Sequence, residues 1–250
     1  MRQIGILRSL GVAALLALVQ SATAANLVLE SPDEQVTVVE LYTSHGCNSC
    51  PPADAWLRRL IDHPDLWHRL VPLSFHVDYW DYLGWSDRFA RPDFSQRQRN
   101  YRRSGGLRTV YTPGMLLNGQ EWRGWLRHTS PPISSGESAG KLRLELEPSG
   151  SALLAFHSTQ AHQTLEAHMA ILGFGVSTAI GGGENAGKTL KEDFVVLGMS
   201  NGKPVNGKVL QWKLPQPDLR RARTERLAIV AWVSTAGNPR PLQTVAGWLP

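Results

Sequence analysis

Apolar and polar positions along the first half of the chain follow the order expected of strands joined by helices. The β-branched run QVTVVEL at 35–41 predicts a buried strand, and LVPLSFHV at 70–77 predicts a second one. Between them, ADAWLRRLID at 53–62 has apolar residues at helical spacing and follows two prolines, which a helix tolerates in its first turn. A polar helix near 95–103 and a short strand at 115–119 complete a series that is typical of an α/β layout.

The pattern changes in the middle of the chain. The segment 127–140, RHTSPPISSGESAG, is rich in proline, serine and glycine, which is typical of a linker. From there to the C-terminus, short strand-like runs alternate with turn residues, and Asn201-Gly202 is a strong hairpin signal. We therefore expect an α/β domain at 25–126, followed by a small all-β sandwich domain at 141–250.

The N-terminal residues 1–24 have the three parts of a secretory signal peptide. Two arginines precede an apolar run from Leu10 to Val19, and Ala22-Thr23-Ala24 offers a small-residue cleavage site. The apolar run is about half as long as the roughly 20 residues that a membrane-spanning helix needs. We therefore expect cleavage of the leader and export to the bacterial periplasm, without a membrane span in the mature protein. An uncleaved anchor is the alternative.

The charge balance gives no reason to expect a nucleic-acid partner. The 250 residues include 26 Lys and Arg against 21 Asp and Glu, and two of the arginines belong to the leader. The remaining excess of positive charge is small, and an exported protein rarely meets nucleic acid.

The chain holds two cysteines, Cys47 and Cys50, in the stretch ELYTSHGCNSCPPAD. A small exported protein that is held together by disulfides shows four or more spaced cysteines. A bridge that closes so short a loop removes little chain entropy and adds little stability. Redox chemistry and metal binding therefore remain as the two interpretations of the pair.

Redox chemistry is the interpretation that the local pattern favours. Cys47 precedes a predicted helix, where unpaired amides and the helix dipole stabilise a thiolate, so we expect it to be the more exposed, more acidic and attacking thiol. Cys50, within the first turn, is placed to resolve the mixed disulfide. In the metal-binding alternative, the two thiolates bind Zn(II) together with His45 and His76, or bind Cu(I) by themselves.

Four motifs together resemble a known family. VELYTSHGCNSCPPAD, HVDYWDYLGWSDRFA with QRQRNY, VYTPGMLLNG and GGGENAGKTL are similar to a bacterial family of exported proteins catalogued as domain of unknown function 1223. The order of strand, C-x-x-C helix, Thr-Pro and strand over residues 33–126 resembles the thioredoxin superfamily. The resemblance implies a thioredoxin-like domain followed by a β-rich domain, and it implies no established substrate.

The resemblance also implies roles for residues outside the cysteine pair. Pro113 is expected to be a cis-proline opposite the cysteines, and Thr112 is expected to offer backbone groups to a bound peptide. Glu40 resembles the buried acid that thioredoxins use as a proton acceptor for the resolving thiol; a strand-edge glutamate that faces water is the alternative. Asn48-Ser49 replaces the usual Gly-Pro between the cysteines, which leaves the direction of electron flow open.

Two further segments carry hypotheses about binding. Trp80 and Trp85, in HVDYWDYLGW, either line a groove for an unfolded or apolar peptide or pack beneath an inserted loop. His45 either lies beside Cys47, where it adjusts the pKa of the thiol and binds the substrate, or ligates a metal. The run from Gly182 to Thr189 matches the nucleotide-binding pattern G-x-x-x-x-G-K-[ST]. A strand-like run follows it where a helix is needed, so we interpret it as a glycine-rich loop.

These observations predict an exported thiol–disulfide oxidoreductase that acts on protein thiols or disulfides of the periplasm, together with an unidentified redox partner. The residues assigned to it are, for catalysis, Cys47, Cys50, Glu40 and Pro113 and, for substrate binding, Thr112, His45, Trp80 and Trp85. We expect no cofactor and no bound metal. The alternatives are a periplasmic copper-binding protein that uses the same cysteines and a non-catalytic binding module on a thioredoxin-like scaffold.

Overall fold

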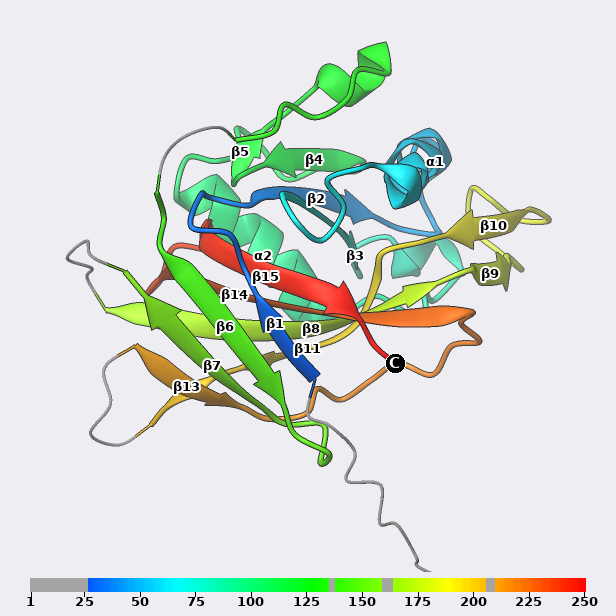
Figure 1. The fold of residues 1–250 in the computed structure, drawn as a ribbon. Coiled ribbons are helices and arrows are strands. Elements are labelled where there is room, and N and C mark those ends of the chain that lie inside the picture. The colour runs from blue at the N-terminus through cyan, green and yellow to red at the C-terminus, as the bar shows by residue number, and fades with distance from the viewer. Residues whose placement is uncertain (1–26, 135–137, 159–163, 206–209) are drawn as a thin grey trace, which may run out of the picture.

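The structure is a computed structural model in which residues 27–134, 138–158, 164–205 and 210–250 are described (Figure 1). The predicted signal peptide lies outside the described residues, as does a short part of the predicted linker. No helix in the described ranges is long and apolar enough to cross a membrane.

One eight-stranded sheet runs through both halves of the chain (Figure 1). Its strands, in spatial order, are β15 (Pro241–Trp248), β14 (Arg226–Thr235), β8 (Leu165–Phe174), β11 (Val195–Asn201), β3 (Leu70–His76), β2 (Thr37–Thr43), β4 (Gly114–Leu117) and β5 (Gln120–Glu121). The halves meet where β11 lies parallel to β3, with Val195 opposite Ser74. There the Ser74 amide donates a hydrogen bond of 2.9 Å to the Phe194 carbonyl.

The helices belong to the N-terminal half of the chain. α1 (Pro51–Arg58) follows β2, and α2 (Pro92–Arg103) lies between β3 and β4 in the sequence. In the described ranges, three short 3-10 helices connect the larger elements: η1 (Arg59–Asp62), η2 (Asp81–Leu83) and η3 (Gly124–Arg127). α1 begins at the proline pair and buries Ala53, Trp56 and Leu57, whose spacing places them on one face of the helix. The helix and strands expected around the cysteines are therefore confirmed to within a few residues.

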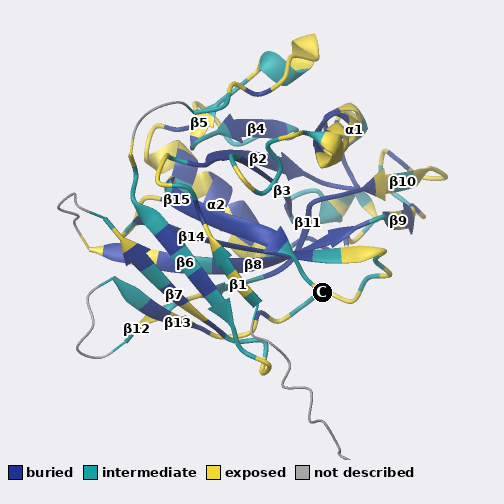
Figure 2. Cartoon of the chain, in the orientation of Figure 1, coloured by how far each residue is buried: buried dark blue, intermediate teal, exposed yellow. Residues whose placement is uncertain are grey.

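A five-stranded antiparallel sheet packs against the larger sheet. Its order is β1 (Leu27–Glu30), β6 (Lys141–Leu146), β7 (Ala152–His157), β13 (Gln211–Leu214) and β12 (Lys203–Pro204). Its inward residues, such as Leu142 and Leu154, join Met169 of β8 and Ile229 of β14 in one apolar cluster, part of the dark-blue interior in Figure 2. The remaining strands, β9 (Val176–Ala179) and β10 (Thr189–Glu192), form a hairpin beside α1.

The predicted fold class, an α/β thioredoxin-like domain followed by a separate all-β sandwich, is wrong. Most of the regular structure is β-sheet, the described residues contain two α-helices, and the sandwich shares its larger sheet with the N-terminal half. The missed signal is the apolar run in MAILGF of β8 and in LAIVAWV of β14, which the structure buries almost continuously. Such runs are typical of strands covered on both faces, not of strands with one face in water.

His168 of β8 is a half-buried histidine on this sheet. Its ring stacks on Trp232 with centroids 5.2 Å apart. Its two nitrogens lie 2.8 Å from Asn201 Oδ1 and 3.1 Å from Ser234 Oγ. Burial, and then the nearby cation of Arg97, lowers the pKa of His168 to about 4.

We expect the free energy of unfolding to fall as the pH is lowered from about 6.5 to about 4, because the unfolded chain binds a proton at His168 in this range and the folded chain does not. The loss from this residue is at most about 3.5 kcal/mol, since the shift is about 2.5 pKa units and each unit corresponds to about 1.4 kcal/mol. Urea unfolding at neutral and mildly acidic pH measures it. His168→Gln should show a shallower pH dependence, and an equal slope in both proteins would refute the assignment.

Candidate active site

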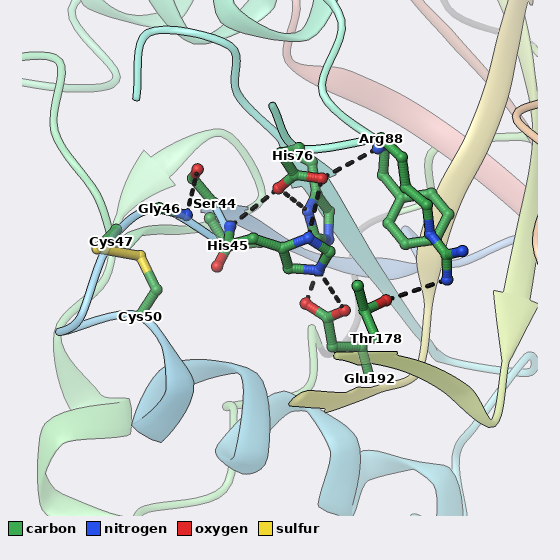
Figure 3. Close-up of polar contacts among 12 residues, drawn as sticks. Ser44, His45, Gly46, Cys47, Cys50, His76, Arg88, Thr178 and Glu192 are labelled. Atoms are coloured by element: carbon green, nitrogen blue, oxygen red, sulfur yellow. Dashed lines mark hydrogen bonds and ion pairs between the residues drawn. A yellow bond between two sulfur atoms is a disulfide. The ribbon is translucent and has the colours of Figure 1, made fainter. Parts of the chain in front are cut away.

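Cys47 and Cys50 form a disulfide in the loop between β2 and α1 (Figure 3). Their Cα atoms are 5.5 Å apart, and Cys50 caps α1, ahead of Pro51 and Pro52 in the first turn. Cys47 Sγ lies 3.3 Å from Ser49 Oγ. The exposed fractions of Cys47 and Cys50 are 1% and 0%, so the greater exposure expected of Cys47 is not found in the disulfide form.

A cavity of about 540 Å³ with a mainly apolar lining lies beside the cysteine loop. It is lined by Ser49, Pro52, Tyr111, Pro113, Trp125 and Leu126, among others. The Thr112-Pro113 peptide bond is cis, as expected. The cavity therefore offers apolar surface next to Ser49, the residue that contacts the Cys47 sulfur atom.

The two tryptophans expected to bind substrate are not among the residues that line this cavity. Trp80 is half-buried and donates a hydrogen bond of 2.7 Å from Nε1 to Thr112 Oγ1. Trp85 packs against the loop between β9 and β10, where a Cβ atom on Gly181 would lie 3.0 Å from the indole ring. Both tryptophans thus hold together the loops around the disulfide. The Thr112 hydroxyl already accepts a hydrogen bond from Trp80.

Glu40 is fully buried, and its carboxylate binds α2. Arg97 donates two hydrogen bonds of 2.9 Å to it, and the hydroxyls of Tyr42 and Tyr101 donate two more, at 2.9 and 2.5 Å. Among the described residues, none of these partners is a cysteine. A carboxylate held by a guanidinium is not a free proton acceptor, so the structure does not support the role expected for Glu40.

His45 and His76 lie side by side with ring centroids 5.0 Å apart, between two carboxylates (Figure 3). Glu192 lies 2.8 Å from His45 Nε2 and 3.5 Å from His76 Nε2. Asp87 lies 2.7 Å from His76 Nδ1 and 3.2 Å from His45 Nδ1. All four side chains are buried, so the sequence-predicted pair of histidines becomes part of a four-residue polar cluster in the interior.

Burial and charge shift the pKa values in and near this cluster. Burial alone would lower the pKa of His76, but the carboxylates of Asp87 and Glu192 outweigh it and raise the pKa to about 9. Burial would raise the pKa of Asp87, but the two histidines hold it well below its usual range. Burial, and then the charge of Glu192, raises the pKa of Asp54 in α1 to about 8. Asp54 Oδ2 accepts a hydrogen bond of 3.1 Å from Thr43 Oγ1.

The loop between β9 and β10 holds the cysteine loop in place. Asn185 is fully buried and donates from Nδ2 to the carbonyls of His45 and Cys47, at 2.9 Å each. Lys188 Nζ donates in turn to Asn185 Oδ1 at 2.9 Å. A single amide therefore satisfies two backbone carbonyls on the approach to the disulfide.

The sequence interpretation of this segment as a glycine-rich loop agrees with the structure, because strand β10 follows it and not a helix. A Cβ atom on Gly182 would lie 2.5 Å from the Gly84 carbonyl oxygen, so the loop needs a glycine there to approach its neighbour. Sequence reasoning missed the contact of Asn185 with the cysteine loop. The local signal for this contact was the run of glycines at 181–183. Such a run indicates that the loop lies close to another part of the backbone, but it does not identify that part.

Residues 38–234 match the family model described as a protein of unknown function, DUF1223. The chain is similar to the crystal structure of a protein from Agrobacterium tumefaciens, with 26% identity, a TM-score of 0.52, and coverage of 86% of this chain and 95% of that chain. It is also similar to HBP35 of Porphyromonas gingivalis, with 11% identity, a TM-score of 0.51, and coverage of 88% and 76%, a likeness of fold alone. No curated protein sequence matches the chain.

Proposed function

The chain belongs to the DUF1223 family, whose function is unknown, and we propose that it is an exported thiol–disulfide oxidoreductase that acts on proteins through Cys47 and Cys50. The observation that carries the proposal is the place of the disulfide, at the first turn of α1 and beside an apolar cavity. A bridge between cysteines three positions apart adds little stability, so a structural role explains the pair poorly.

We assign Cys47 as the attacking thiol because of its surroundings. Its sulfur atom contacts Ser49 Oγ, and Ser49 lines the cavity, whereas Cys50 is the N-cap residue of α1. Both sulfur atoms are buried while the disulfide is closed. A substrate protein that packs an apolar segment against Trp125 and Leu126 would therefore approach the disulfide from the side of Cys47.

In the reducing direction, the Cys47 thiolate attacks a substrate disulfide, forms a mixed disulfide and releases one substrate sulfur, which takes up a proton. The Cys50 thiolate then attacks the Cys47 sulfur atom, closes the Cys47–Cys50 bond and releases the second substrate sulfur, which is also protonated. The substrate gains two electrons and two protons, and the protein loses them. The reverse steps oxidise a substrate dithiol, and a redox partner protein with a dithiol or a disulfide restores the starting state.

The copper-binding alternative has less support from the geometry. It requires free thiolates, whereas Cys47 and Cys50 are joined to each other. Both nearby imidazoles contact carboxylates and not the sulfur atoms.

Export is part of the proposal. Residues 1–24 carry the pattern of a signal peptide, and disulfides persist in oxidising compartments such as the bacterial periplasm. The proposed substrates are protein thiols or disulfides of that compartment.

We expect Cys50→Ala to accumulate as a mixed disulfide with periplasmic proteins, because the attacking thiol remains while the resolving thiol is gone. Cys47→Ala should trap at least roughly tenfold less, because the attacking thiol is gone while the resolving one remains. Non-reducing electrophoresis of acid-quenched extracts, followed by mass spectrometry of the trapped species, measures both.

Ser49→Ala is the matched control, because it changes the same loop and keeps both cysteines, and it should trap no partner. The purified protein should also accelerate the reduction of insulin by dithiothreitol, and the variant without both cysteines should not. Equal trapping by the two single variants, or trapping by neither together with inactivity on insulin, would rule out the proposal.

A further inference from the structure

Three donor side chains that the proposed thiol chemistry does not use converge in the interior beside the cysteine loop. One ring nitrogen of His45, one of His76 and a carboxylate oxygen of Glu192 all lie within 4.8 Å of one another, and all three residues are buried. They come from the loop after β2, the end of β3 and the end of β10. In Figure 3 the His45 ring points toward Glu192 and away from the two sulfur atoms.

The Nε2 atom of His76 is the clearest sign of a missing ligand. It is buried and has no hydrogen-bond partner among the described residues. The other nitrogen, Nδ1, lies 2.7 Å from Asp87 Oδ2 and holds a proton there, and Nε2 faces Glu192, whose Oε1 is 3.5 Å away. A bound ion would take the place of the proton on Nε2. A histidine held by a carboxylate through one nitrogen, with the other nitrogen free, has the arrangement of a metal-ligating imidazole.

Asp87 is itself fixed, as an orienting carboxylate must be. It accepts hydrogen bonds from the backbone amides of His45 and Phe89, at 2.9 and 3.0 Å. The Phe89 ring packs edge-on against both imidazoles, with centroid distances of 5.8 Å to His45 and 5.4 Å to His76. The two rings are therefore held in position before any ion binds.

The carboxylates of Glu192 and Asp87 form no ion pair with a lysine or an arginine of the described residues. In the described part of the chain, the ion pairs of Glu192 and of Asp87 are with histidines alone. Two carboxylates buried away from water need two positive charges, and the protonated imidazole of His76 supplies one of them. A divalent cation between the imidazoles and Glu192 would supply both.

We propose that His45, His76 and Glu192 bind one divalent transition-metal ion of the zinc type, with Asp87 orienting the two histidines. Two imidazoles and one carboxylate are a ligand set that such ions accept.

A cavity lies beside one of the three proposed ligands, Glu192. This cavity, of about 610 Å³ between α1 and the β9–β10 hairpin, is lined by Glu192 together with Arg58, Val176 and Asp193, among others. Once bound, the ion would connect β10 to the loop that carries the disulfide, since His45 lies two positions before Cys47. We therefore expect it to stabilise the folded chain, while thiol–disulfide exchange uses other atoms.

The test uses the mature protein with its disulfide closed, so that no thiolate can bind the ion. After treatment with a chelator, the protein is titrated with Co(II) by visible absorption and with Zn(II) by calorimetry. We expect one ion per chain, Co(II) bands without sulfur-to-metal charge transfer, and a higher Tm in the presence of the ion. Glu192→Gln should weaken binding by at least about 100-fold and Asp87→Asn by about 10- to 100-fold.

His157→Gln is the matched control, because His157 is an exposed histidine of β7, and it should bind as the wild type does. Circular dichroism verifies that each variant is folded, and Glu192→Gln and Asp87→Asn both keep the shape of the side chain that they replace. No saturable binding to the wild type would overturn the proposal. Binding that survives in folded Glu192→Gln would overturn it as well. The trapping experiment does not depend on either outcome, so the two proposals fail separately.

Discussion

Replacing Arg97 by methionine is expected to lower the free energy of unfolding by about 3–5 kcal/mol. The guanidinium makes two hydrogen bonds of 2.9 Å to the Glu40 carboxylate, and the two residues are 6% and 1% exposed. Without Arg97 the carboxylate stays buried without a cation, which is the costliest way to break an ion pair. The guanidinium also donates to the Pro239 carbonyl at 3.0 Å, so its loss loosens α2 from the turn before β15.

Urea unfolding followed by circular dichroism measures this loss. Arg99→Met is the matched control, because Arg99 is an exposed arginine of the same helix, and we expect a change below about 0.5 kcal/mol. Removing both charges, in Glu40→Gln/Arg97→Met, should recover part of the stability, since no charge then remains buried. A loss below about 1 kcal/mol in Arg97→Met would mean that the pair behaves like an exposed ion pair, against this prediction.

Asn185→Ala should destabilise the cysteine loop by about 2–3 kcal/mol, because it leaves the carbonyls of His45 and Cys47 buried without their donor. A change of 2 kcal/mol raises the open fraction of a loop about 30-fold, since 1.4 kcal/mol corresponds to a factor of ten. The Cys47–Cys50 disulfide is buried, so a small thiol reaches it mainly when the loop opens. We therefore expect dithiothreitol to reduce the disulfide roughly 30- to 150-fold faster in this variant.

Thiol release measured over time gives the rate, and urea unfolding gives the stability. Two other residues of the same loop serve as controls. Lys188 is exposed and contacts Asn185 Oδ1, so Lys188→Ala should cost less than about 1 kcal/mol. Glu184 is exposed and accepts a hydrogen bond of 2.9 Å from the Asn48 amide, so Glu184→Gln should change the rate less than Asn185→Ala does. Equal rates of reduction in all three variants would show that Asn185 does not hold the loop closed.

The sequence by itself determined the local elements around the cysteine pair. The β-branched runs at 35–41 and 70–77 became β2 and β3, and the proline pair opened α1 directly after Cys50. These outcomes are local, because strand and helix periodicity and the fixed φ of proline act over a few residues. The C-x-x-C spacing likewise limited any bridge between the cysteines to a short loop.

Only the tertiary structure decided which strands became neighbours. Periodicity shows which face of a strand is apolar, but it does not identify the strand that pairs with each edge. Here β11 lies against β3 and extends one sheet from the N-terminal half into the C-terminal half, where two separate domains were expected. The continuous burial of β8 and β14 follows from that pairing. The second sheet covers one face, with Met169 and Ile229, and the core of the N-terminal half covers the other, with Leu172 and Val230.

The surroundings of the disulfide were decided in the same way. The sequence identified Cys47 and Cys50, but Asn185 reaches Cys47 across 138 positions and Glu192 reaches His45 across 147. Glu40, expected to serve the cysteines, is instead bound to Arg97 of α2. Polar groups that fold into the interior need partners there, because leaving them unpaired away from water is unfavourable. Local sequence thus determines which groups are polar, and the path of the whole chain determines which partner each of them finds.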